Sequence, residues 1–88
     1  MFEFDPAKSA NNLTKHGIDF EEAQKLWLDP RRIQVEAQSD SEPRGAMLAR
    51  LKNKIWFAVY TKRGAKIRII SVRRARNKEK GIYENDSS

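Results

Sequence analysis

Apolar and polar side chains alternate along short stretches at the start of the chain and throughout its second half. The alternation predicts a short strand at residues 2–4 and further strands at 33–37, 46–51, 55–61 and 66–72. Only a few residues separate the last three strands from one another. These strands should therefore be antiparallel neighbours in a meander.

A helix is predicted between the first two strands, over residues 6–16. Asp5 before a proline is a typical helix start, because the carboxylate caps free backbone N–H groups, and Gly17 is a typical helix end. The helical spacing of three apolar residues indicates the buried side. The residues expected to face the core are Ala7, Ala10 and Leu13.

Two more helices are predicted from their start and stop signals. Asp19 begins a second helix that should run to the Asp29-Pro30 pair. A third helix is expected at 74–84, where Gly81 weakens it, and residues 85–88 should form a frayed tail. The residues expected to be buried on the second helix are Phe20, Ala23, Leu26 and Trp27.

The predicted order is one strand, two helices, four strands and one helix, within a single domain of residues 1–88. This order predicts an α+β fold, in which the two N-terminal helices pack on one face of an antiparallel sheet. The other face would then be partly open to solvent or to a ligand.

The composition excludes several classes of protein. The chain has no cysteine, and its single histidine and scattered carboxylates form no cluster at the spacing of metal ligands, so neither a metal nor another cofactor is expected. The longest apolar run, residues 55–60, is far shorter than the ~20 residues that cross a bilayer. The acidic start of the chain does not resemble a signal peptide, so we expect a cytoplasmic protein.

Charge is the feature that changes this picture most. The net charge is +6, and nine of the 18 lysines and arginines lie between Lys62 and Lys80, with Glu79 as the only acid among them. Such a stretch is typical of binding to a polyanion, and RNA is the preferred interpretation. A solvated basic face kept for solubility and a docking face for an acidic protein remain alternatives.

Arg68 stands out because it lies within a strongly apolar strand. Strict alternation would place it on the face of Val72, opposite Ile67. Arginine is seldom buried without a partner, so this side chain should hold either a phosphate or a cross-strand carboxylate. The carboxylates considered for that pairing are Glu36 and Glu42.

Four other residues are candidates for the same chemistry. Arg73 and Arg74 follow the strand, where a phosphate could approach them. His16 could act as a general acid or base, or it could stabilise the end of its helix as a cation. Glu42 could orient an arginine, act as a base, or simply be solvated in a polar loop.

The chain resembles the BrnT toxin family in motifs that follow one another in order from residue 2 to residue 84. Each motif is weak alone, but their order and spacing together are specific. The matching pieces are Phe4-Asp5-Pro6-Ala7-Lys8, Asn12-Leu13, Lys15-His16-Gly17-Ile18, Phe20-Glu21-Glu22-Ala23, Glu42-x-Arg44, Tyr60-Thr61, residues 67–75, and Glu79 followed by Tyr83.

The resemblance implies a RelE-like fold and a ribonuclease toxin of a type II toxin–antitoxin system. It also implies a BrnA-like antitoxin with a ribbon–helix–helix domain, and a complex of the two that binds its own promoter DNA. The motif positions carried over as functional are Lys8, His16, Glu42, Arg44, Arg68, Ser71, Arg73, Arg74, Glu79 and Tyr83. Where the family commonly has arginine after the glutamate, this chain has Lys80, which lacks the planar fork for phosphate.

The expected reaction is metal-independent cleavage of RNA by its own 2′-hydroxyl. Arg68 and Arg73 would stabilise charge on the phosphorus, while Lys8, Arg44, Ser71 and Arg74 would bind the RNA backbone. The base would be Glu42 or Glu79, and the acid His16 or Tyr83. A regulator that binds nucleic acid without cleaving it, and an interaction module with a basic docking face, are the alternative functions.

Overall fold

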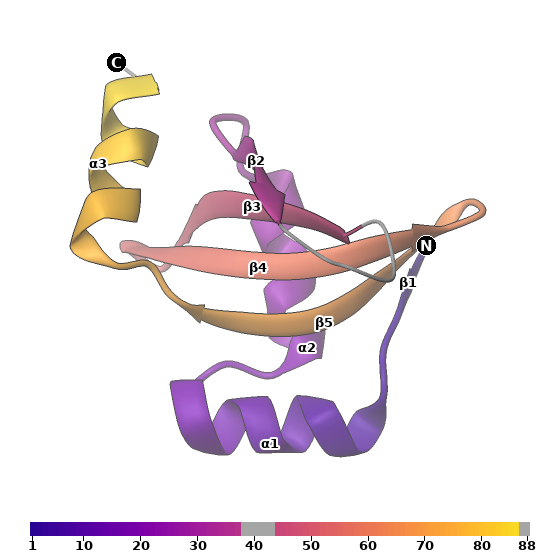
Figure 1. Cartoon of the computed structure of the whole chain (residues 1–88). Helices are drawn as coiled ribbons and strands as arrows, with labels where there is room; N and C mark the ends of the chain where they lie inside the picture. The colour runs from indigo at the N-terminus through magenta and orange to yellow at the C-terminus, as the bar shows by residue number, and fades with distance from the viewer. Residues whose placement is uncertain (38–43, 87–88) are drawn as a thin grey trace.

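A computed structural model of the chain describes residues 1–37 and 44–86, and Figure 1 shows their arrangement. Nine elements follow one another along these residues, and most of them occupy the ranges that hydrophobic periodicity predicts. They are β1 (Phe2–Glu3), α1 (Pro6–His16), α2 (Phe20–Ala23), η1 (Gln24–Leu28, a 3-10 helix), β2 (Ile33–Ala37), β3 (Arg44–Leu51), β4 (Lys54–Arg63), β5 (Lys66–Arg74) and α3 (Asn77–Asp86).

The strands form one five-stranded sheet in the order β1-β5-β4-β3-β2. Strands β2 to β5 are an antiparallel meander, as the short connections predict. The expectation of a wholly antiparallel sheet is wrong at one edge, because β1 pairs parallel with β5, Phe2 beside Ile67 and Glu3 beside Arg68. A parallel pair needs a long crossover, and the helices and the meander supply it. The sheet is therefore mixed, and the α+β class is confirmed.

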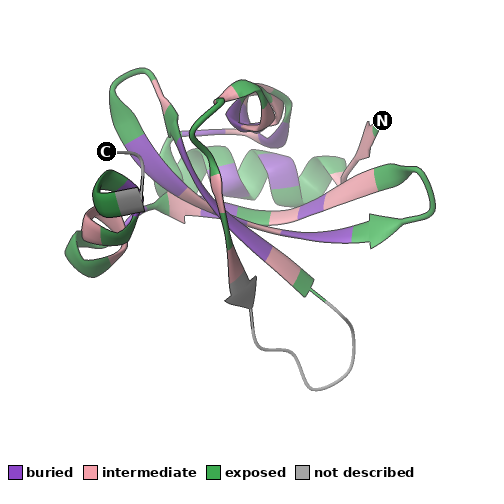
Figure 2. Ribbon diagram, turned by 90° about the horizontal axis from the view of Figure 1, so that it is seen from above, coloured by how far each residue is buried: buried purple, intermediate pink, exposed green. Residues whose placement is uncertain are grey.

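The helices are distributed over both faces of this sheet. Helices α1 and α2 lie along one face, while α3 stands at one end and reaches the other face (Figure 1). The larger core lies under α1 and α2 and includes Phe20, Leu26, Met47 and Ile69. A smaller core of Leu48, Ile55, Ala75 and Tyr83 joins α3 to the sheet. In Figure 2, buried residues lie along the middle of the strands and exposed residues at their ends.

Helix α1 begins and ends where the sequence predicts, but it buries a different side. Asp5 accepts a hydrogen bond from Ala7 N, and Gly17 takes the left-handed conformation at φ 81° that ends the helix. The prediction that Ala7, Ala10 and Leu13 face the core is wrong, because all three are exposed. The buried residues are Ser9 and Asn12.

These polar residues are buried because backbone groups in the core require partners. The hydroxyl of Ser9 accepts a hydrogen bond from Phe20 N at 2.8 Å. The side-chain amide of Asn12 bonds to Ile18 O and to both backbone groups of Val72. A buried backbone group without a partner costs free energy, so satisfying these groups outweighs burying the alanines.

The boundaries of the other two helices shift by a few residues. The second predicted helix is α-helical only over α2, which Asp19 caps by accepting from Glu22 N, and it continues as the 3-10 helix η1. The third helix begins at Asn77 because Arg74 still belongs to β5. It continues to Asp86, two residues into the segment expected to fray, and residues 87 and 88 lie outside the described part.

A β-bulge in β5 decides which way the functional side chains point. Val59 pairs with Ser71, whereas Tyr60 pairs with Ile69, so Ile70 is an extra residue in β5. Strict alternation fails at this point, and Ile69 and Val72 both enter the core under the helices. The prediction that Val72 shares a face with Arg68 is therefore wrong.

The same bulge brings two arginines onto one face of the sheet. Arg68 pairs with Thr61 and Arg73 pairs with Phe57, both on the face turned away from α1 and α2. Without the extra residue, positions five apart on a strand would point in opposite directions. Bulges are common beside active sites, where they change the direction of a side chain.

Candidate functional site

An open hollow of about 720 Å³ lies at the end of the sheet where β4 turns into β5. We call it the basic hollow, because half of the described residues that line it are cationic and none of these described residues is acidic. It draws side chains from α1 and from strands β2 to β5, which are far apart in the sequence. Its cations are Lys8, Arg44, Lys62, Arg63 and Arg68, and its other lining residues are Gln34, Gly45, Tyr60, Thr61 and Ile70.

One carboxylate moderates the charge at the side of this hollow. Glu3 lies 3.8 Å from both Arg63 and Arg68, because β1 places it beside Arg68 in the sheet. At that distance neither contact is a close hydrogen bond. Two guanidinium groups sharing one carboxylate leave a net positive charge, so an anion would still be attracted here.

The wall of the hollow depends on close packing between Gly45 and Tyr60. These residues face each other on β3 and β4, and a Cβ atom at Gly45 would lie 2.6 Å from the Tyr60 ring. The ring also packs edge-on against Trp27, with 5.4 Å between the ring centroids. Burial raises the pKa of the Tyr60 hydroxyl, so it stays neutral and able to donate a hydrogen bond at neutral pH.

Lys8, Arg44 and Arg68, three of the residues predicted from sequence, come together in the basic hollow. Sequence reasoning did not single out the neighbouring side chains of Gln34 and Thr61, and it treated Lys62 and Arg63 only as general charge. Thr61 and Arg68 pair directly across β4 and β5. A prediction of the register between these two strands would have placed Thr61 beside Arg68. The contact with Gln34 depends on folding of the whole meander.

His16 and Arg74 lie in a second, smaller hollow at the opposite end of β4. Its volume is about 150 Å³, and it lies between the end of α1 and the turn that joins β3 to β4. We call it the turn hollow, and the lysines and arginine that line it are Lys52, Lys54 and Arg74. His16 is therefore separated from Arg68, and the structure does not bring these two predicted residues together.

Arg73 is held by contacts within the protein. Its guanidinium donates two parallel hydrogen bonds to the Glu79 carboxylate, at 2.8 and 2.9 Å, and lies 4.2 Å from the centre of the Phe57 ring. Glu79 also accepts from Arg76 N at the start of α3. Hydrogen bonds from Arg73 and Arg76 outweigh partial burial and lower the pKa of Glu79. A carboxylate held in this way is a weak proton acceptor, so these contacts favour a structural role for Glu79 over a role as catalytic base.

Tyr83 is buried at 2% exposure and donates a hydrogen bond to Asp29 Oδ2 at 2.7 Å. The same oxygen accepts from Arg50 N, so Asp29 joins η1, β3 and α3. Partial burial would raise the pKa of Asp29, but the hydrogen bonds from Arg50, Tyr83 and Arg31 together lower it. Burial first, and then the bond to Asp29, raise the pKa of Tyr83. These contacts favour a role in fixing α3.

The last two predicted residues are Ser71 and Glu42. Ser71 is exposed on β5 beside the bulge, between Arg68 and Arg73. Glu42 lies outside the described residues, and the sequence places it two positions before Arg44. Across residues 1–37 and 44–86, no cluster of three or more His, Cys, Asp or Glu could hold a metal ion, and no helix is long and apolar enough to cross a membrane.

The fold and the basic hollow define a class: a small α+β domain whose sheet carries a hollow lined by cationic side chains. The chain belongs to the BrnT family, since the family model for "Ribonuclease toxin, BrnT, of type II toxin-antitoxin system" matches residues 4–79. It is therefore a ribonuclease toxin, and a type II system implies an antitoxin partner. Curated proteins gave no match. The matched range includes both hollows and ends at Glu79, so Tyr83 lies beyond it.

Proposed function

We propose that the chain is an endoribonuclease toxin that cleaves RNA in the basic hollow without a metal ion. The observation that supports this proposal is the convergence of five cationic side chains around one open hollow, with Arg68 among them. Cleavage of a phosphodiester builds negative charge on the phosphorus, and fixed cations lower the energy of that state. Arginine suits this role because its planar fork can hold two phosphate oxygens at once.

In the proposed reaction the 2′-oxygen of the RNA attacks the adjacent phosphorus. A bond from this oxygen to phosphorus forms and the bond from phosphorus to the 5′-oxygen breaks, which leaves a 2′,3′-cyclic phosphate and a 5′-hydroxyl. The 2′-hydroxyl proton passes to a base, and the leaving 5′-oxygen receives a proton from an acid. Arg68 would stabilise the charged intermediate, and Lys8 and Arg44 would position the RNA backbone.

The residues that move protons stay predictions from the sequence. Glu79 is engaged by Arg73, which leaves Glu42 as the preferred base. For the acid, His16 lies in the turn hollow and Tyr83 donates to Asp29, so both are separated from Arg68. Tyr60 is among the residues that line the basic hollow, and its hydroxyl is the acid we favour.

The wider biological setting follows from family membership and is proposed with it. We propose a RelE-like fold, a BrnA-like ribbon–helix–helix antitoxin that neutralises the toxin, and binding of the complex to its own promoter DNA. The described residues include two N-terminal helices on one face of a sheet, which supports the fold assignment. The site of action would be the cytoplasm, where RNA and the antitoxin meet.

The test compares purified wild type with Arg68→Ala on a mixed RNA substrate, in the presence of a chelator. Wild type should cleave RNA and leave cyclic phosphate ends, whereas R68A should cleave roughly 100- to 1000-fold more slowly. Lys78→Ala removes one exposed charge from α3 and should retain wild-type activity. A strict requirement for magnesium, or equal rates for R68A and K78A, would contradict the proposal. RNA binding without cleavage by the wild type would favour a regulator.

A further inference from the structure

The turn hollow gathers positive charge from two separate parts of the chain. Lys52 and Lys54 come from the turn between β3 and β4 and the start of β4, and Arg74 comes from the end of β5. His16 lines the hollow from the end of α1. Its volume of about 150 Å³ corresponds to roughly five water molecules. The hollow is therefore large enough for one anionic group and too small for a folded partner.

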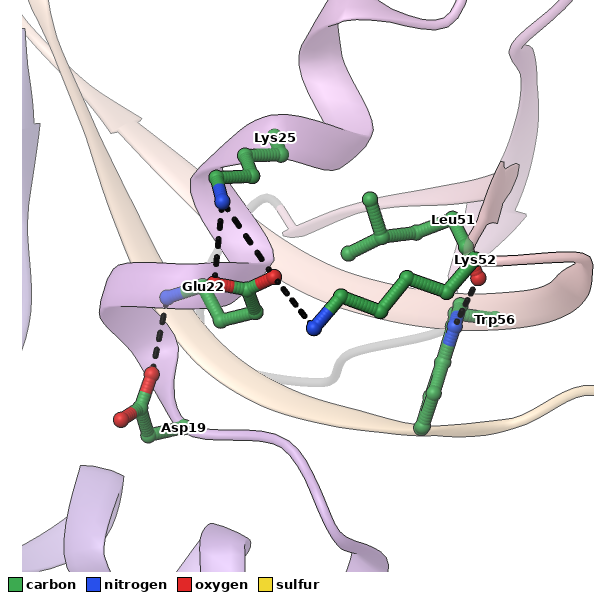
Figure 3. A network of polar contacts seen from close by, with 6 residues as sticks. All are labelled: Asp19, Glu22, Lys25, Leu51, Lys52 and Trp56. Carbon is green, nitrogen blue, oxygen red and sulfur yellow. Dashed lines mark hydrogen bonds and ion pairs between the residues drawn. The ribbon is translucent and has the colours of Figure 1, made fainter.

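Among the described residues that line the turn hollow, Glu22 is the only acidic one, and its carboxylate is already engaged. Figure 3 shows it between two lysines, with Lys25 at 3.2 Å and Lys52 at 3.3 Å. Among the described residues, no carboxylate lies within ion-pair distance of Lys54 or of the Arg74 guanidinium. These two cations are free to meet an anion from solution.

Arg74 is held in an orientation that suits such a ligand. Its guanidinium lies 5.6 Å from the centre of the Trp56 ring. Trp56 is in turn fixed, because it is 6% exposed and its Nε1 donates to Leu51 O at 3.3 Å (Figure 3). A guanidinium resting on a fixed indole loses less freedom when it binds a phosphate.

The turn itself carries a lysine in a conformation that does not favour lysine. Lys52 and Asn53 both have positive φ, 53° and 64°, which is the conformation of a tight hairpin turn. Asparagine and glycine adopt it readily, whereas a lysine there costs conformational energy. Strained residues of this kind are concentrated at functional sites, which supports a binding role for the Lys52 side chain.

We propose that the turn hollow binds a backbone phosphate of the RNA substrate at a distance from the cleaved bond. Arg68 and Arg74 are six residues apart on β5, which corresponds to about 20 Å along the strand. The two side chains point to opposite faces of the sheet, so an RNA strand of several nucleotides would reach both sites by passing around the edge of the sheet. This inference rests on the proposed function, because it takes RNA as the ligand, and it assigns Lys54, Arg74 and Lys52 to affinity and not to chemistry.

The test measures binding of a fluorescently labelled 2′-O-methyl RNA of about 12 nucleotides, within the length range that single-strand grooves hold. This RNA lacks the attacking hydroxyl, so binding is measured without cleavage. Lys54→Ala should weaken binding roughly fivefold to tenfold and lower the salt slope by about 1. Lys78→Ala removes the same charge from α3 and should bind as wild type does.

Two substitutions in the turn separate charge from backbone conformation. Lys52→Asn fits the positive φ better but removes the charge and its exposed ion pair with Glu22, so it should change Tm little while weakening RNA binding. Asn53→Gly also favours the turn but keeps every charge, so it should leave RNA binding unchanged. If Lys52 had only a structural role, Lys52→Asn would change Tm and leave RNA binding unchanged.

Three outcomes would overturn the inference. The first is equal binding by K54A and K78A, both folded as judged by thermal unfolding. The second is that K52N binds as tightly as N53G. The third is that adenosine monophosphate binds as tightly as the RNA, which would indicate a site for free nucleotides. If binding depends on Lys54 but no RNA is ever cleaved, the proposed function fails while the phosphate site stands.

Discussion

Asn12 and Val72 pair as if they were neighbours in the sheet. The side-chain amide of Asn12 donates to Val72 O at 2.8 Å, and its oxygen accepts from Val72 N at 3.2 Å. Within residues 1–37 and 44–86, β1 pairs with β5 at Ile67 and Arg68 alone, so beyond that point no described strand pairs with the edge of β5. One side chain from α1 thus satisfies the sheet edge at Val72 and joins the helix to the strand that carries Arg68.

This pairing predicts that Asn12→Ala strongly destabilises the fold. The substitution leaves Ile18 O and both backbone groups of Val72 without their partner in a buried place. We expect a loss of about 3 kcal/mol, which corresponds to a fall in Tm of roughly 12–24 °C for a domain of this size. Asn11→Ala is the matched control, because Asn11 is exposed and should change Tm little. Equal Tm values for the two variants would contradict this account of the sheet edge.

The Arg73–Glu79 pair predicts a specific dependence of stability on pH. The hydrogen bonds from Arg73 hold the pKa of Glu79 below its ordinary value of 4.5. Because the folded-state pKa is lowered, the stabilisation is fully present above about pH 4.5 and is lost as pH falls through the folded-state value. Glu79→Gln should therefore lower stability by about 1–2 kcal/mol at pH 7, and this difference should shrink at pH values below 4.5.

Denaturant unfolding of wild type and E79Q at both pH values measures this effect. Glu21→Gln is the control, because Glu21 is exposed on α2 and the substitution removes the same charge. A difference between wild type and E79Q that stays constant from pH 7 down to low pH would mean that the ion pair contributes nothing.

Two glycines should respond in opposite directions to the same substitution. Gly45→Ala would place a Cβ 2.6 Å from the Tyr60 ring, so we expect a loss of about 1–3 kcal/mol and a distorted basic hollow. Gly81→Ala lies within α3, where a Cβ would meet open space, and should raise stability by about 0.5–1 kcal/mol. Thermal unfolding of both variants checks the pair. Two shifts of the same sign would contradict the packing described here.

The Tyr83–Asp29 hydrogen bond predicts how α3 is attached. Tyr83→Phe keeps the ring but removes the bond of 2.7 Å to Asp29, and should destabilise the fold by about 1.5–3 kcal/mol. Amide hydrogen exchange in α3 should accelerate more than exchange in the strands. Ile82→Ala, at a residue that is 42% exposed on the same helix, serves as control. Uniform acceleration in every element would show that the bond does not act on α3 in particular.

Local signals in the sequence predicted most elements correctly. Asp5 and Gly17 mark the two ends of α1, and Asp19 caps α2, because capping depends only on neighbouring residues. The buried side of α1 was predicted wrongly. The rule that apolar residues face inward takes no account of buried backbone groups that need a hydrogen-bond partner. That need arises at Val72, sixty positions after Asn12.

The candidate site was predictable in composition but not in arrangement. Lys8, Arg44 and Arg68 were selected from the sequence, and the structure places all three around the basic hollow. The positions of Thr61 and Ile70 beside Arg68 depend on the register between β4 and β5, which the bulge at Ile70 sets, and Gln34 and Gly45 depend on the pairing of β2 to β4. An isoleucine fits a regular strand as well as a bulge, so its sequence context carries no signal of the extra residue.

The sequence by itself determined the α+β class, both ends of α1, the concentration of charge toward the C-terminus and, through its motifs, membership of the BrnT family. These properties depend on short stretches of chain or on composition. The tertiary structure decided that β1 lies parallel to β5, that Arg68 and Arg73 share a face, and that His16 lies apart from Arg68. Each of these depends on contacts between residues distant in sequence, whose free energy no local pattern records.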